Sequence, residues 1–78
     1  MNVRYKNNIY FFKNNDLEMN ILFLETKEKY NLDDKFTESI VKLYLSKKRY
    51  NCSYSEETES IIRKYFNNKI DLWVNNMK

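Results

Sequence analysis

Residues 55–77, SEETESIIRKYFNNKIDLWVNNM, dictate the fold that the sequence predicts. Their apolar side chains recur at the three-to-four spacing of a helix, at Ile61, Ile62, Tyr65, Phe66, Ile70, Leu72, Trp73, Val74 and Met77. Ser55 is the expected N-cap, or Ser53 forms a capping box with Glu56. A continuous helix here would be about 30 Å long and would cross a domain of this size.

The apolar arc of this helix is wider than the stripe of about 100° that one packed layer requires. We therefore expect the helix to be central in its own fold or covered by a second chain. Tyr65, Leu72 and Trp73 belong to residue types that anchor protein interfaces, and Lys69 interrupts the arc. These four residues form the predicted protein-binding site, although the stem of Lys69 could instead lie along the edge of the core.

The N-terminal segment predicts a β-hairpin. The stretches VRYK and IYFFK flank an asparagine pair at positions 7 and 8, and asparagine tolerates the left-handed conformation that a two-residue turn requires. The expected register places Tyr5 opposite Tyr10 and Val3 opposite Phe12 on one apolar face. Because an isolated hairpin is marginal in water, this face should pack on a helix, or the hairpin should gain a third strand.

Residues 14–30, NNDLEMNILFLETKEKY, fit two structures. A helix from about Asp16 is favoured by apolar residues at helical spacing and by the capping-box spacing of Asn15 and Glu18. A third strand over residues 19–24 is the alternative, because that run is also apolar enough for a strand. We favour the helix.

A second helix is predicted from Asp33 or Asp34, and cations near its negative end should terminate it at residues 47–49. Its apolar stripe comprises Phe36, Ile40, Val41, Leu43 and Tyr44. The predicted fold class is therefore α+β and mostly α, in a single small domain over residues 1–78. An N-terminal hairpin of two or three strands packs against two or three helices, and the long C-terminal helix is central.

The composition argues against catalysis. The chain has no His to act as a base and no Gly to build a phosphate loop, and its one thiol, Cys52, therefore lacks a catalytic partner. The adjacent acids stand at expected helix starts, where they act as caps. We expect no enzymatic activity, no metal and no cofactor. The absence of a signal-peptide pattern and of a long apolar run predicts a cytoplasmic protein.

Binding to DNA or RNA is the alternative function. The net charge is +3 and the sequence pI is about 9.0, and cations with interleaved aromatic rings are typical of nucleic-acid contacts. The candidate residues are Arg4, Lys6, Lys13, Lys47, Lys48, Arg49 and Tyr50. Three acids, Glu56, Glu57 and Glu59, oppose a helix-turn-helix because they would meet the phosphates. A homodimeric structural protein is the third class.

The preferred function is stoichiometric protein binding. Abundant Asn, Lys, Ile and Tyr follow AT-rich codons, which are common in small reading frames of phages and mobile genetic elements. We therefore expect an accessory inhibitor that blocks a host protein, with a CRISPR-type defence nuclease as a plausible target. Such an anti-CRISPR-like protein would bind through an aromatic surface on the long helix or on the hairpin.

Overall fold

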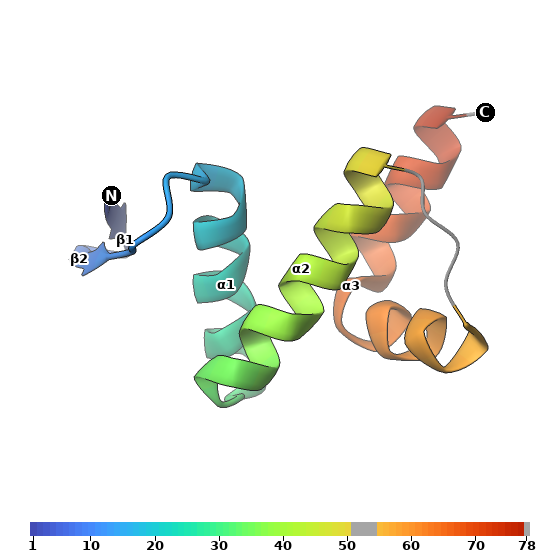
Figure 1. The fold of residues 1–78 in the computed structure, drawn as a ribbon, viewed down its shortest axis with the longest axis horizontal. Helices are drawn as coiled ribbons and strands as arrows, with labels where there is room; N and C mark the ends of the chain where they lie inside the picture. The colour runs from blue at the N-terminus through green and yellow to red at the C-terminus, as the bar shows by residue number, and fades with distance from the viewer. Residues whose placement is uncertain (51–54, 78) are drawn as a thin grey trace. The chain divides into compact units, whose positions relative to one another are not determined.

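The computed structural model describes residues 1–50 and 55–77, with side chains described as far as Phe66. The elements are β1 (Asn2–Tyr5), β2 (Asn8–Phe11), α1 (Leu17–Tyr30), α2 (Asp34–Tyr50) and α3 (Glu56–Met77) (Figure 1). The predicted α+β, mostly helical class is confirmed. The third strand is wrong, because residues 19–24 lie inside α1.

The chain divides into two compact units, Met1–Val41 and Lys42–Lys78. The hairpin, α1 and the first half of α2 form the first unit, and the second half of α2 belongs with α3 in the second. None of the helices in the described ranges combines the length and the apolar content needed to cross a bilayer.

The hairpin turns one residue earlier than the sequence predicts. Val3 pairs with Tyr10 and Tyr5 pairs with Asn8, so Lys6 and Asn7 form the turn, with φ values of 47° and 68°. Two positive φ values in a two-residue loop are typical of a type I′ turn, whose twist matches that of the strands. The predicted pairing of Tyr5 with Tyr10 is therefore wrong by a slip of two residues.

This slip leaves the faces of the hairpin unchanged, because side chains alternate with a period of two along a strand. The hydrophobic pattern alone could not distinguish the two registers. The observed register also adds a rung beyond the assigned strands, in which the Phe12 amide donates to the Met1 carbonyl at 2.8 Å. The Met1 ammonium donates in turn to the Phe12 carbonyl at 2.6 Å.

Helix α1 starts at Asp16, whose side chain accepts from the Met19 amide at 3.1 Å. The predicted capping box of Asn15 with Glu18 is therefore wrong, because the N-cap is Asp16 and the residue three positions after it is Met19. The helix ends at Asn31, a left-handed residue with φ of 52°, which is a common way to terminate a helix.

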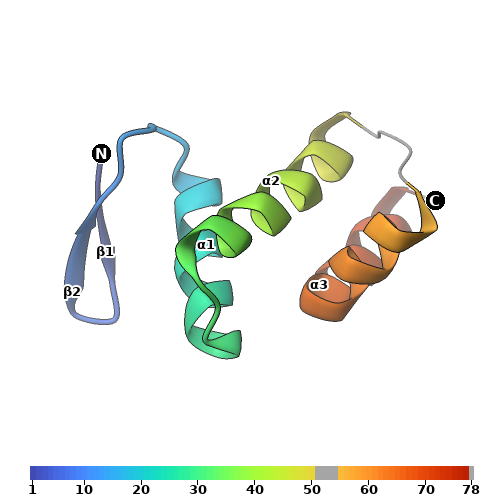
Figure 2. The same ribbon diagram turned by 60° about the horizontal axis from the view of Figure 1, so that its bottom comes forward.

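Helix α1, and not α3, is the central element of the first unit. Asn20 and Leu24 are buried on one side of it, and Leu22 and Thr26 are buried on the opposite side. The hairpin lies beside α1 on the side away from α2 (Figures 1 and 2). The apolar residues of α1 are spread around the helix axis. The sequence of α1 therefore lacks the single apolar stripe that is typical of a helix packed on one side only.

Helix α3 is not a continuous rod. Ser55 caps it, accepting from the Thr58 amide at 3.3 Å, and Ser53 lies outside the described residues. Phe66 has non-helical angles, φ −131° and ψ 25°, so two helical segments meet at a kink. The Phe66 ring is 3% exposed and stacks on Tyr44, with the centroids 4.5 Å apart and the planes at 7°. Burial of this ring, with no proline involved, accompanies the break.

Candidate protein-binding surface on the hairpin

Strand β2 projects from the first unit while β1 is packed into it. Val3 of β1 is 3% exposed, and β1 packs on α1. All four residues of β2 are exposed, with Ile9 at 66% and Phe11 at 73%. One helix is too narrow to cover two strands fully, so β2 overhangs it. Ile9 and Phe11 form what we call the β2 surface.

The backbone edge of β2 is also free for pairing. Met1 and Phe12 exchange two hydrogen bonds, and in an antiparallel ladder such rungs alternate with rungs in which the backbone groups point outward. Arg4 pairs with Ile9, and Asn2 pairs with Phe11. In both pairs the backbone N–H and C=O groups of β2 therefore point away from β1. The strand sequence NIYF carries no charge and no proline, the usual guards against pairing with another strand.

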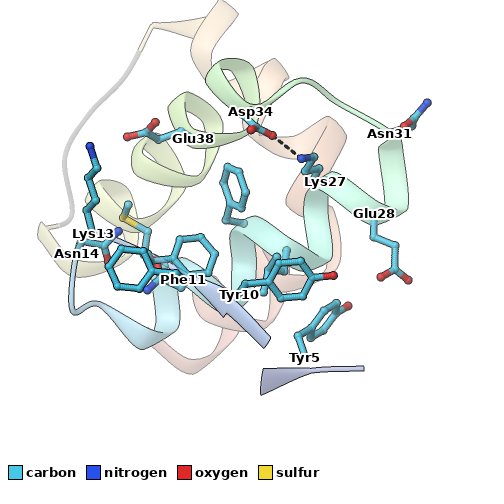
Figure 3. Close-up of a pocket in the computed structure, with 15 residues that line it drawn as sticks. Tyr5, Tyr10, Phe11, Lys13, Asn14, Lys27, Glu28, Asn31, Asp34 and Glu38 are labelled. Atoms are coloured by element: carbon cyan, nitrogen blue, oxygen red, sulfur yellow. Dashed lines mark ion pairs between the residues drawn. The ribbon is translucent and has the colours of Figure 1, made fainter. Parts of the chain in front are cut away.

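A groove of about 820 Å³ lies under the overhanging strand. Figure 3 shows the rings of Tyr5, Tyr10 and Phe11 along one wall, with the ion pair between Lys27 and Asp34 across from them. All of its lining residues belong to the first unit. Deeper in the unit, the rings of Phe12 and Phe23, which also line the groove, meet edge to face with their centroids 5.8 Å apart.

Charges around the groove are paired. Lys27 and Asp34 lie 2.5 Å apart. Lys6 of the turn forms an ion pair with Glu28, and the hydrogen bond that its ammonium donates to this carboxylate, followed by the negative charge of the carboxylate, raises the pKa of Lys6. Both partners of that second pair are largely exposed, so it orients the turn more than it stabilises the fold.

One buried polar atom at the groove has no partner. Asn20 lines the groove and is 1% exposed. Its amide nitrogen is 3.6 Å from the Met1 sulfur, and its Oδ1 accepts no hydrogen bond in the structure. The sequence gave no reason to single out this residue, because an asparagine inside a helical pattern is usually exposed.

The predicted site on α3 is described only in part. Tyr65 is half-buried and takes part in an interaction of its own. The side chains of Lys69, Leu72 and Trp73 lie outside the described residues, so their grouping stays a prediction. The sequence pointed to the hairpin as an alternative binding surface but did not single out Ile9 and Phe11 as site residues, although strand alternation had already placed them on the face opposite Val3.

The predicted basic cluster at the C-terminal end of α2 already takes part in interactions within the chain. Lys47 forms an ion pair with Glu59, and its side chain is only 15% exposed. Burial lowers the pKa of Lys47, and the nearby Arg63 lowers it further. Lys48 and Arg49 each interact with other groups. The ring of Tyr50 is 73% exposed.

The N-terminal basic residues do not gather at one place. Arg4 is exposed opposite Ile9 on the outer face of the hairpin. Lys13 is exposed at the groove, and Lys6 is paired with Glu28 at the turn. The three residues thus have different settings in the first unit, and their grouping as a nucleic-acid site stays a prediction.

Comparison with known proteins found no family model, no curated protein and no solved structure that matches this chain. Over the described residues, no cluster of three or more potential metal ligands occurs.

Proposed function

We propose that this chain is a non-catalytic protein-binding module that docks through the β2 surface. The exposure of all four β2 residues carries the proposal. Ile9 and Phe11 place two large apolar side chains beside an unpaired strand edge. A partner can add a strand to such an edge, with backbone hydrogen bonds giving affinity and the alternate side chains giving specificity.

The ion pairs favour this function over nucleic-acid binding. Lys6 and Lys47 already face carboxylates, and a cation engaged in this way contributes less to phosphate neutralisation than a free one. The modest net charge of +3 supports the same preference. Binding of DNA or RNA remains the second candidate, and self-association through β2 the third.

The biological setting that we propose is inhibition of a host protein by a phage or mobile-element product acting in the host cytoplasm. Its support is the composition, rich in Asn, Lys, Ile and Tyr. A CRISPR-type defence nuclease fits as target because occupation of a protein surface can block a nucleic-acid channel without chemistry. The chain itself would need no active site, metal or cofactor.

Affinity capture from host extract with matched variants tests the proposal. Ile9→Thr and Phe11→Thr remove apolar area from β2 and keep a residue suited to strands. Leu17→Gln removes comparable apolar area from α1, where Leu17 is 52% exposed, and serves as the control. We expect capture to fall at least about tenfold for the β2 variants and to be unchanged for the control.

Two further measurements separate the other classes. Titration with labelled duplex and single strands at two salt concentrations should show no tight, steeply salt-dependent binding. Sedimentation over a range of concentrations should show a monomer. Equal capture by the β2 variants and the parent chain would overturn the assignment of the surface.

A further inference from the structure

The unpaired acceptor of Asn20 is the starting point. Asn20 is 1% exposed in the middle of α1, and the Met1 sulfur occupies the donor side of its amide. Its Oδ1 is buried and accepts no hydrogen bond from the residues that the structure describes. Such atoms are rare in folded proteins because burial without a hydrogen bond is unfavourable. A donor from another molecule would satisfy it.

The groove limits the size and shape of the chemical group that could bring a hydrogen-bond donor to Asn20. Asn20 shares the lining with the rings of Tyr10, Phe12 and Phe23, in a space of about 820 Å³. Pockets for drug-sized ligands have volumes of about 300–1,000 Å³ and combine aromatic walls with few polar atoms, so this groove has room for an aromatic side chain and the residues next to it. A flat aromatic ring can stack on these walls or meet their edges.

The charges exclude an ionic ligand. Lys27 pairs with Asp34, and Glu28 pairs with Lys6, so these groups offer no uncompensated charge to a cation or an anion. Lys13 and Glu38, which also line the groove, carry opposite charges. The matching group is therefore neutral, aromatic and equipped with an N–H or O–H donor.

We infer that the groove receives an indole or phenol side chain of the protein partner, whose N–H or O–H donates to Asn20 Oδ1. This inference rests on the proposed function and deepens it, because the partner would cover the β2 surface while inserting one anchor beside it. Tryptophan and tyrosine are the aromatic residues that dominate interface energetics. A donor-bearing ring would therefore find both its stacking partners and its acceptor in one place.

Free indole and 1-methylindole test the groove without the partner. The two probes share a ring system, but only indole can donate a hydrogen bond. NMR titration of the full chain should show shifts at Asn20, Phe23 and Tyr10, with indole binding at least about threefold more tightly, as one neutral hydrogen bond predicts. Equal affinity for the two probes, or shifts confined to residues outside the groove, would overturn the inference.

Asn20→Leu supplies the matched variant. It should abolish the preference for indole over 1-methylindole and keep or raise the melting temperature, since it removes the unpaired acceptor. The parent chain with both probes keeps the inference testable even if this variant folds poorly. Ile9→Thr lies outside the groove lining and should leave indole binding unchanged while weakening capture of the partner. Failure of the groove and failure of the β2 surface are thereby distinguished.

Discussion

Phe66→Ala should remove most of the stability of the second unit. Phe66 is 3% exposed and stacks on Tyr44 at 4.5 Å, so truncation loses both the transfer of the ring from water and the stack. Buried Phe→Ala substitutions cost about 3–5 kcal/mol, and an aromatic pair accounts for about 0.5–1.5 kcal/mol of such a loss. A chain of this length has a total stability of about 4–12 kcal/mol.

Urea unfolding followed by far-UV circular dichroism measures the loss in free energy of unfolding. Ile61→Ala is the control, because Ile61 is on the same helix and is 40% exposed, so its truncation should cost about 1 kcal/mol or less. Phe66→Leu keeps most of the volume and should cost about 1–2 kcal/mol. Amide exchange should accelerate first in residues 42–50 and 56–66, the described part of the second unit.

The reasoning would be refuted if Phe66→Ala were no more destabilising than Ile61→Ala. That result would mean that the ring is not buried in solution and that the kink of α3 does not depend on it. Unchanged exchange in residues 42–50 would also contradict the stack with Tyr44, because that stack is the contact through which the substitution should act.

Three smaller predictions test the turn, a cap and a charge. Asn7→Val should destabilise the hairpin by about 1–2 kcal/mol, since a β-branched residue is unfavourable at positive φ. Asn8→Val should be tolerated, because position 8 lies in a strand. Thermal unfolding of the two variants measures the difference. Asp16→Ala should cost about 1 kcal/mol in urea unfolding, and Asn15→Ala should cost little, because Asp16 is the observed cap. Below the lowered pKa of Lys47, burial of its positive charge reduces the free energy of unfolding. This reduction becomes smaller as the pH rises towards the ordinary pKa of 10.5. Lys47→Met removes this buried charge together with its ion pair to Glu59, so its stability relative to the parent should be highest near neutral pH and should fall as the pH rises above it.

The hairpin illustrates what periodicity determines and what it leaves open. Alternation placed Val3 and Tyr10 on the inward face and Ile9 and Phe11 on the outward face, and both placements hold. The register was wrong because either turn preserves that alternation, and nothing in the sequence marks Lys6 as a left-handed residue. The observed register includes the extra rung between Met1 and Phe12, two residues eleven positions apart in the sequence, and no local turn signal encodes that contact.

The helices show a second limit of sequence reasoning. The start of α3 was predictable from Ser55 and the acids that follow it, but its kink carries no proline or glycine. Only the Asn pair at positions 67 and 68, a poor helix-forming combination, could have suggested a break after Phe66. The break and the burial of the ring depend on Tyr44 in another helix, and a contact of this kind has no local pattern.

The groove could not be predicted at all. Asn20 stood in an apolar run that fitted a helix, which we favoured, or a strand, and neither interpretation placed it beneath a hairpin. Its burial follows from the central position of α1, which in turn depends on coverage from two sides. A polar residue becomes informative only when its surroundings are known.

The uncharged strand β2 has a consequence for the amount of this protein that a cell can hold. A sheet edge without lysine, proline or a bulge offers a template to any other extended chain, including a copy of itself. Far above the concentrations at which we expect a monomer in sedimentation, uncovered hairpins should pair with one another through this edge. Under the proposed function, a partner bound to β2 would cover this edge and prevent such self-pairing.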